Sequence, residues 1–157
     1  MVQSETSRDA RDSDLPGEYR CNVPEEEFLR IREKKRELWI ETAHGNTYAT
    51  LKVNVIKALL RKGLSFMNLL PVSVPKIRNY ASGQVLSVFI LPPGKEELRR
   101  RLQSRGESPE QIDRRMADCK KWEEEAIFSY IPYEFVRNEG TVAEAVEKME
   151  QIIESKT

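Results

Sequence analysis

Arginines and hydroxyl-bearing residues are the side chains of this sequence best suited to chemistry. Guanidinium forks match the oxygens of a phosphate group, and hydroxyl groups add neutral donors. Such residues gather in the first fifty positions and would form a competent anion pocket if the fold brought them together: Ser4, Arg8, Arg11, Tyr48 and Thr50. Three further arginines, Arg101, Arg105 and Arg115, stand in a later charged stretch.

Each of these groups also has a simpler interpretation. Residues 1–22 are polar, carry charges of both signs and are, in isolation, typical of a disordered tail. The later arginines are balanced by nearby acidic residues, as on a solvated helix face. Tyr48 would also suit packing within a turn, and Thr50 would suit capping of a helix that follows it.

The histidine and the two cysteines indicate no other catalytic or metal chemistry. His44 stands in a turn and has no acid, serine or cysteine partner at a recognisable spacing. Cys21 and Cys119 lack the close spacing of a zinc or redox motif, and we interpret them as reduced thiols. We therefore expect neither a metal nor a cofactor.

Composition excludes several classes of protein. The 157 residues carry 26 basic and 26 acidic side chains, so the formal charge of zero gives no electrostatic case for nucleic-acid binding. The best apolar run, residues 85–93, stops at two prolines and is too short to span a membrane. The first residues lack the basic segment followed by an apolar segment that is typical of a secretory signal peptide. We expect one cytoplasmic domain with neither nucleic-acid nor membrane partners.

The apolar pattern predicts strands that alternate with amphipathic helices. Helices are predicted from Pro24 to near Arg36, from residue 51 to a C-cap glycine at Gly63, as a pair within residues 94–126, and from a capping box at Thr141 and Glu144. Strands are predicted over residues 38–42, 64–70, 85–91 and 127–137. The residue types at positions 44–48 predict a hairpin-like turn that leads into another extended segment. Such alternation implies an α/β sandwich with a largely parallel sheet.

Several motifs resemble guanylate kinases. Residues 88–93, 95–98, 100–106 and 108–116 resemble the lid segment of that family. Ser4-Glu5-Thr6-Ser7-Arg8 with Arg11 is similar to the family's Ser-x-Thr-Thr-Arg-x-x-Arg element, and residues 45–50 are similar to its Gly-Asn-x-Tyr-Gly-Ser/Thr turn. Residues 136–139 resemble its Val-x-Asn-Asp. These weak motifs occur in the family's order along the whole chain, which makes coincidence a poor explanation.

The resemblance implies a three-layer α/β sandwich of the P-loop kinase type that lacks the first strand, the P-loop and its helix. It assigns residues 1–157 to one guanylate-kinase-like domain, residues 1–50 to GMP binding and residues 94–126 to the lid. In the family, the matching serine, arginines and turn residues hold the GMP phosphate, and lid arginines reach the phosphates of ATP. The resemblance thus implies that Arg101, Arg105 and Arg115 could clamp a transferring phosphoryl group. The family's phosphate tyrosine falls by counting on Arg20, and a slip of one residue would place Tyr19 there.

The sequence departs from the family pattern at residues that phosphoryl transfer requires. No Gly-x-x-x-x-Gly-Lys-Ser/Thr loop occurs in the 157 residues, and such a loop cradles the β-phosphate of ATP. Leu69 and Pro71 stand where the family has two carboxylates for magnesium and guanine. Trp39 stands in the place of the base-reading glutamate, with Glu37 and Glu41 nearby. We therefore expect phosphoryl transfer to fail.

Three hypotheses about function follow. The first is a catalytically inactive relative that keeps a phosphate pocket for GMP or a phosphorylated peptide, as the similarity to membrane-associated guanylate kinase scaffolds implies. The second is a fragment of a true ATP:GMP phosphotransferase. The third is a remnant that folds poorly, because the missing strand would leave a sheet edge uncovered, and such an edge also favours homo-oligomers.

Overall fold

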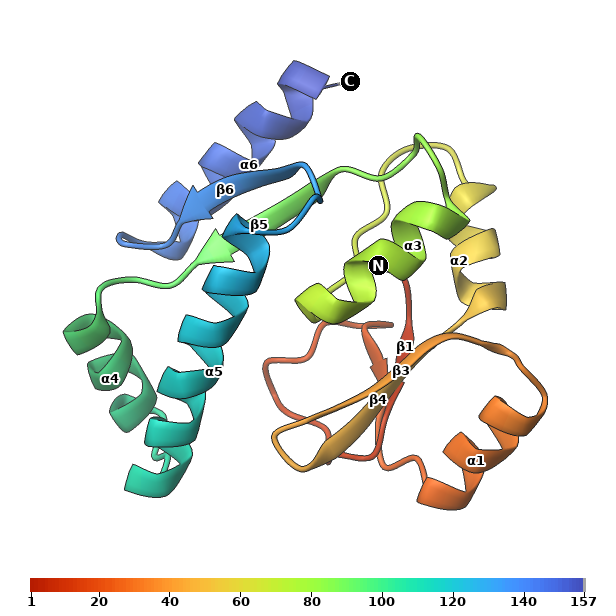
Figure 1. Cartoon of the computed structure of the whole chain (residues 1–157), viewed down its shortest axis with the longest axis horizontal. Coiled ribbons are helices and arrows are strands. Elements are labelled where there is room, and N and C mark those ends of the chain that lie inside the picture. The colour runs from red at the N-terminus through yellow and green to blue at the C-terminus, as the bar shows by residue number, and fades with distance from the viewer. Residues whose placement is uncertain (157) are drawn as a thin grey trace. The chain divides into compact units, whose positions relative to one another are not determined.

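The computed structural model describes residues 1–156, which divide into a first compact unit, Met1–Gly83, and a second that begins at Gln84 (Figure 1). The first unit contains β1 (Ser4–Thr6), β2 (Tyr19–Arg20), α1 (Glu25–Glu33), β3 (Glu37–Ala43), β4 (Asn46–Leu51), α2 (Lys52–Leu59), the short 3₁₀ helix η1 (Pro71–Ser73) and α3 (Val74–Tyr80). Its sheet has the order β2-β1-β4-β3; β1 and β2 are parallel, and the other pairs are antiparallel.

One face of this sheet carries the apolar core of the first unit. Ala49 of β4 packs with Val23, Phe28 and Ile31, all at most 4% exposed. The helix α1 that supplies Phe28 and Ile31 begins after Pro24, has three glutamates in its first turn and has arginines in its last turn, an arrangement that suits the helix dipole. Because side chains alternate along a strand, the neighbours of Ala49 in β4 must face the other side.

A two-residue turn joins β3 to β4. His44 and Gly45 both have positive φ, 51° and 79°, as a type I′ hairpin requires. The strand pairs run from Ala43↔Asn46 to Glu37↔Leu51, with an irregularity between Glu37 and Trp39. The predicted turn is therefore confirmed, and it sets which side chains of β3 and β4 share a face.

Two expectations for the first unit are wrong. Helix α2 ends at Leu59 with Leu60 as its C-cap in a right-handed conformation, so Gly63 is not the C-cap, although its φ is 89°. Residues 64–70 do not form a strand; their apolar side chains include Leu64 and Phe66, which are 61% and 47% exposed. The Val2 amide donates to the Phe66 carbonyl at 2.8 Å, but among residues 1–156 this segment joins no strand ladder.

The interpretation of residues 1–22 as a disordered tail is also wrong. Val2 is 6% exposed, and Ser4, Glu5 and Thr6 of β1 are buried in the middle of the sheet. The cause is pairing with β4, a segment more than forty residues away, which local polarity does not reveal.

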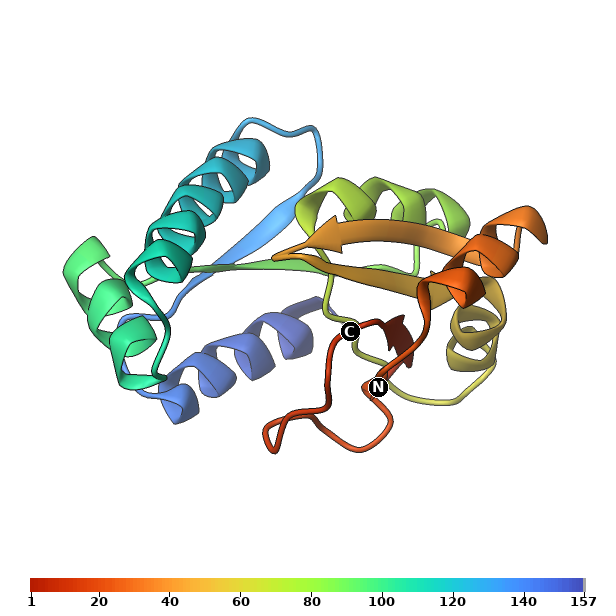
Figure 2. The ribbon, with the colours of Figure 1, turned by 90° about the horizontal axis from the view of Figure 1, so that it is seen from below.

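The second unit contains β5 (Ser87–Leu91), α4 (Lys95–Ser104), α5 (Pro109–Ile127), β6 (Tyr133–Arg137) and α6 (Val142–Lys156). Strands β5 and β6 are parallel, in register from Ser87↔Tyr133 to Leu91↔Arg137. Figure 2 shows α5 and α6 on opposite sides of this strand pair. The predicted strand over 127–137 is shorter than expected: Ile127 still belongs to α5, residues 128–132 form the loop, and β6 begins only at Tyr133.

Helices α5 and α6 of the second unit begin at capping boxes, whereas α4 follows Gly94 without a side-chain cap. The Ser108 hydroxyl accepts from the Gln111 amide, and the Gln111 side chain accepts from the Ser108 amide. Thr141 and Glu144 make the corresponding contacts before α6, as predicted. The apolar face of α6 is less covered than expected, since Val142 and Val146 are 77% and 45% exposed.

The α/β class is confirmed, since strands and helices alternate along the chain. Within residues 1–156, none of the helices combines the length and the apolar character needed to cross a bilayer.

Candidate functional site

A pair of buried hydroxyl groups marks the sheet face opposite the apolar core. Ser4 of β1 and Thr50 of β4 are 46 positions apart, and their Oγ and Oγ1 atoms are 2.7 Å from each other. Both residues are buried. Thr50 precedes α2 by two residues but does not cap it: Leu51 is the N-cap, and the Thr50 hydroxyl binds Ser4 instead.

A buried arginine follows β1 in the loop that leads to β2. Arg8 is only 8% exposed, and its guanidinium donates to both carboxylate oxygens of Asp14, at 2.6 and 2.9 Å. It also donates to the Asp9 carbonyl at 2.7 Å. The hydrogen bonds from Arg8 lower the pKa of Asp14 to about 2, and those to Asp14 raise the pKa of Arg8 above its ordinary value. The pairing favours the charged form of both groups, so Arg8 stays protonated and Asp14 stays ionised.

Two tyrosines lie beside this arginine. The guanidinium carbon of Arg8 is 4.7 Å from the ring centre of Tyr19, which is within range of a cation–π contact. Tyr19 meets Tyr48 edge to face, with ring centres 6.2 Å apart. Burial raises the pKa of Tyr19, so its phenol stays a neutral hydrogen-bond donor at neutral pH.

The strand register explains why these side chains converge. Ser4 of β1 is opposite Tyr19 of β2, and Thr6 of β1 is opposite Tyr48 of β4. Because residues paired across strands lie on the same face, the hydroxyl pair and the tyrosines share one side of the sheet. Arg20 points elsewhere and binds Glu5 and Glu27, so the residue beside Arg8 is Tyr19 and not the neighbour reached by counting.

Arg11 lies at the margin of this cluster. Its side chain is exposed, and its backbone amide donates to the Asp14 carboxylate at 2.9 Å. Of the residues predicted for a phosphate site, the structure therefore brings Ser4, Arg8, Tyr19, Tyr48 and Thr50 together and leaves the Arg11 side chain in solvent.

Two glutamates of β3 that lie near Trp39 differ in environment. Glu41 is opposite Tyr48, and its Oε1 accepts from the Lys76 ammonium at 2.7 Å and from the Ser73 hydroxyl at 3.5 Å. The Glu37 Oε2 is buried without a hydrogen-bond partner among the described residues. Trp39 between them is 3% exposed, and its indole N–H also has no partner there.

Asp14 and Lys76 are polar partners that the sequence did not reveal as site residues. Asp14 stood within a run of mixed charge, and only the observed loop shows that it closes back onto Arg8. Lys76 lies on α3, which Figure 2 shows running along the β3–β4 hairpin. A spacing of six residues between an arginine and a carboxylate is too common to signal such a pair.

The three arginines predicted for the lid belong to the second unit, where two of them have internal partners. Arg101 donates to Glu97 at 2.6 Å and to the Gly140 carbonyl at 3.1 Å. Arg115 pairs with Glu107 at 2.6 Å, and Arg105 is exposed at the end of α4. Arg100 and Arg101 lower the pKa of Glu97 to about 2. No contact described within residues 1–156 joins these arginines to one another.

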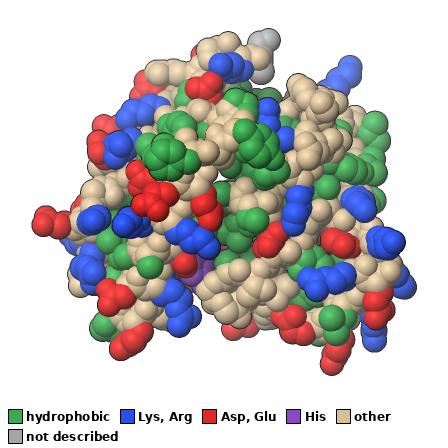
Figure 3. Space-filling model, in the orientation of Figure 1, with side chains coloured by type: hydrophobic (Ala, Val, Ile, Leu, Met, Phe, Trp, Pro, Cys, Tyr) green, Lys and Arg blue, Asp and Glu red, His purple; other side chains and the backbone are tan. Residues whose placement is uncertain are grey.

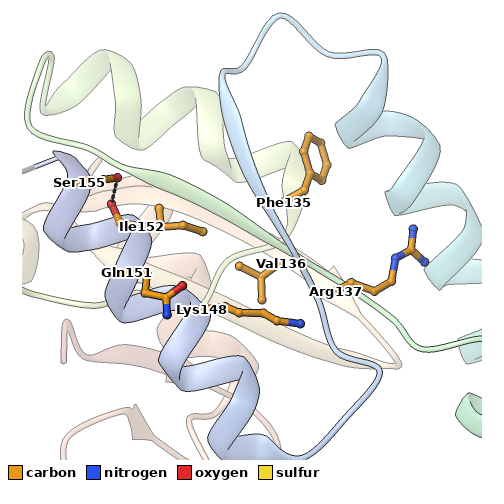
Figure 4. A pocket seen from close by; sticks show the side chains of 7 residues that line it. All are labelled: Phe135, Val136, Arg137, Lys148, Gln151, Ile152 and Ser155. Atoms are coloured by element: carbon orange, nitrogen blue, oxygen red, sulfur yellow. Dashed lines mark hydrogen bonds between the residues drawn. The ribbon is translucent and has the colours of Figure 1, made fainter.

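A groove of about 470 Å³ lies between β6 and α6 in the second unit (Figure 4). Val136 of β6 and Ile152 of α6 give it an apolar lining beside Lys148, whereas the side chains of Phe135 and Arg137 leave β6 on the side away from α6. No predicted site residue lines it.

Within residues 1–156, no group of three or more His, Cys, Asp or Glu side chains is placed to hold a metal ion. Basic and acidic side chains are interspersed over the face seen in Figure 3, without a patch of one sign.

Comparison with known proteins decides the family. The family model described as guanylate kinase matches residues 1–156. The chain belongs to the guanylate kinase family. The resemblance inferred from the motifs is thereby confirmed.

Three similar proteins are guanylate kinases of bacteria. The chain is 34% identical over 137 residues to a guanylate kinase of Prochlorococcus marinus, an alignment that covers 85% of this chain and 70% of that protein. It is 36% identical over 120 residues to a guanylate kinase of Porphyromonas gingivalis, with coverage of 75% and 64%. For a guanylate kinase of Vibrio cholerae the identity is 33% over 135 residues, with coverage of 85% and 62%. The chain thus spans less than two thirds of two of these guanylate kinases.

A solved guanylate kinase has the same fold. The crystal structure of guanylate kinase from Anaplasma phagocytophilum superposes with a TM-score of 0.75 at 23% identity, and the match covers 99% of this chain and 75% of that one.

Proposed function

We propose that this member of the guanylate kinase family binds a phosphate monoester, such as that of GMP or of a phosphorylated peptide, in its first unit. The ligand-binding residues are Ser4, Arg8, Tyr19, Tyr48 and Thr50, with Arg11 at the margin. Residues 1–50 form the phosphate-binding part, and residues 94–126 are its lid-like helices.

The observation that carries this proposal is the buried guanidinium of Arg8 beside two tyrosines. Burying a charged group is costly unless other groups compensate it, so an arginine that is 8% exposed is a feature that a fold keeps only with dedicated support. Asp14 and the Tyr19 ring give that support. Phenol and hydroxyl groups on the same sheet face add neutral donors for phosphate oxygens.

The proposal includes a loss of catalysis, which makes this chain a pseudoenzyme. Phosphoryl transfer needs a backbone cradle, a lysine for the β-phosphate and a ligand for magnesium, and no Gly-x-x-x-x-Gly-Lys-Ser/Thr loop occurs in these 157 residues. Leu69 and Pro71 replace two carboxylates of the family pattern. In addition, Arg101 and Arg115, which the family pattern assigns to phosphates, are held by Glu97 and Glu107.

A second candidate function is the GMP half of an ATP:GMP phosphotransferase. It is favoured by relatives named guanylate kinase that are more than 30% identical over most of this chain, while the chain spans 62–70% of their length. A longer polypeptide would then supply the ATP half.

Calorimetric titration separates these candidates. GMP and a phosphoserine peptide should each release heat, and guanosine, which lacks the phosphate, should bind at least about tenfold more weakly than GMP. Arg8→Ala should weaken GMP binding by a few kcal/mol, about the size expected for charge-assisted contacts, and Arg11→Ala should weaken it less because its side chain is exposed.

Equal binding of GMP and guanosine would refute the phosphate site. Incubation of the 157-residue chain with ATP, magnesium and GMP should yield no GDP above a protein-free control. Formation of GDP by chain freed of host enzymes would refute the loss of catalysis and favour the second candidate.

A further inference from the structure

Within residues 1–156, the hydrogen bonds of Arg8 leave one defined part of its guanidinium without a protein acceptor. An arginine side chain has five N–H donors in a fixed plane. Both donors of Nη1 are used, one by the Asp9 carbonyl and one by Asp14 Oδ2, and one donor of Nη2 is used by Asp14 Oδ1. The Nε–H and the second Nη2–H remain, and these two lie parallel on the same edge of the guanidinium plane.

The end of the guanidinium that carries Nη1 and Nη2 is firmly held. Asp14 grips it with both carboxylate oxygens and is itself fixed by the Arg11 amide at 2.9 Å and by the Cys21 thiol at 3.8 Å. The Tyr19 ring lies against the guanidinium face at 4.7 Å. With its end and one face fixed, the plane of Arg8 has little freedom to turn.

We infer that Asp14 is a positioning residue of the phosphate site, because it holds the end of Arg8 and leaves the Nε–H and Nη2–H edge to grip two oxygens of the ligand phosphate. This inference rests on the proposed phosphate-binding function and adds the mode of binding to it. Two parallel N–H donors match two oxygens of a phosphate group, a geometry that a lysine ammonium does not reproduce.

The contrary role for Asp14 is that of a competitor. A carboxylate near the site would repel a phosphate, and removing its charge would then tighten binding. The hydrogen bonds favour the positioning role. Asp14 binds the end of the guanidinium that carries Nη1 and Nη2, so a phosphate at the edge formed by the Nε–H and the second Nη2–H need not displace it. Without Asp14, the buried charge would lose its counter-ion and its fixed orientation.

Titration with GMP of a matched set of variants tests the inference. Asp14→Asn should weaken GMP binding about tenfold or more, a size typical for loss of a group that orients a binding residue. Asp14→Glu should restore part of the affinity. Asp9→Asn is the control on the same loop; it should leave the affinity unchanged because Asp9 contributes its backbone carbonyl.

A double-mutant cycle shows whether Asp14 acts through Arg8. If it does, Asp14→Asn has no further effect on GMP binding in an Arg8→Ala background, whereas a general structural role would give additive losses. Additive losses, unchanged binding in Asp14→Asn or tighter binding would each overturn the inference. In the unmodified chain, GMP should also shift the Arg8 Nε–H resonance in an NMR titration, and an unmoved resonance would overturn the side-edge geometry.

The same set separates this inference from the function on which it rests. If the unmodified chain binds GMP and Arg8→Ala does not, while Asp14→Asn binds as before, only the role of Asp14 is refuted. If GMP and guanosine bind equally to the unmodified chain, the phosphate site is refuted and the role of Asp14 with it.

Discussion

The Arg8–Asp14 pair should make the first unit sensitive to acid. Asp14 has a folded-state pKa of about 2 against an ordinary value of 3.8, because Arg8 donates two hydrogen bonds to its carboxylate. A carboxyl group whose pKa is lowered by folding stabilises the folded state above its unfolded pKa. That contribution is lost as the pH falls from about 4 to about 2, the interval between the two pKa values.

The size of the effect follows from the two pKa values. A difference of about 1.8 corresponds to about 2.4 kcal/mol at 25 °C. Because 17% of the Asp14 side chain stays in contact with water, screening reduces this to about 1–2 kcal/mol. Asp14→Asn should therefore lower the free energy of unfolding by about 1–2 kcal/mol at pH 6. At pH 2, where about half of the folded-state carboxyl groups are protonated, the difference should fall below about 0.5 kcal/mol, because a protonated carboxyl group resembles the amide that replaces it.

Urea unfolding at a series of pH values measures this difference. Trp39 is buried in the first unit and Trp122 belongs to α5 of the second, so a Trp122→Phe background lets fluorescence report the first unit alone. Comparison of Asp14→Asn with its parent cancels the titration of all other carboxylates. Asp9→Asn serves as the matched control. A stability difference that stays constant from pH 6 to pH 2, or that grows as the pH falls, would refute the reasoning.

Three other substitutions test the packing described above, with urea or thermal unfolding as the measurement. Ser4→Ala leaves the buried Thr50 hydroxyl without its partner and should cost about 1–3 kcal/mol, whereas Ser4→Ala with Thr50→Val should cost less than the separate changes together. Ile31→Ala should cost about 2–4 kcal/mol in the core of the first unit, and Leu29→Ala, on the exposed side of the same helix, less than about 0.5 kcal/mol; equal costs would contradict the assigned face. Ser108→Ala removes the N-cap of α5 and should cost about 1 kcal/mol, and no loss would show that the capping box does not stabilise this helix.

Elements with strong local signals were predicted well from the sequence. The hairpin turn follows from His44-Gly45, where glycine tolerates positive φ, and α6 follows from the hydroxyl and carboxylate of its capping box. Both signals act within a few residues and need no knowledge of the rest of the fold. The boundaries of β6 were less accurate, because apolar residues at the end of α5 continue into the loop.

Elements that depend on distant partners were not predicted. Residues 64–70 are apolar enough for a strand, but a strand exists only where another backbone pairs with it, and none does so within residues 1–156. Conversely, β1 is polar enough for a tail and is a strand because β2 and β4 pair with it. The self-association expected from an uncovered sheet edge stays a prediction.

The candidate site likewise contains residues that were predicted from the sequence and one that was not. Its hydroxyls, tyrosines and buried arginine were named from the resemblance to the family's motifs. The observed register brings Ser4, Tyr19, Tyr48 and Thr50 onto one sheet face, and Arg8 lies beside them in the loop after β1. Asp14 was missed because its role arises from the path of the loop between β1 and β2. Sequence spacing shows which groups can bind an anion, whereas their internal counter-ion depends on the folded loop.

The location of the cluster also explains how phosphate binding would persist where transfer is lost. Its side chains come from β1, β2, β4 and the loop after β1, and the core beneath them is formed by α1 on the opposite face. Leu69 and Pro71, which replace the carboxylates, lie in or beside η1 and contribute to neither layer. Because contacts that share no partner change independently, substitutions at these two positions leave the Arg8 pair and the Ser4–Thr50 hydrogen bond in place. The proposed loss of the transfer chemistry is thus compatible with the proposed anion-binding site on this sheet.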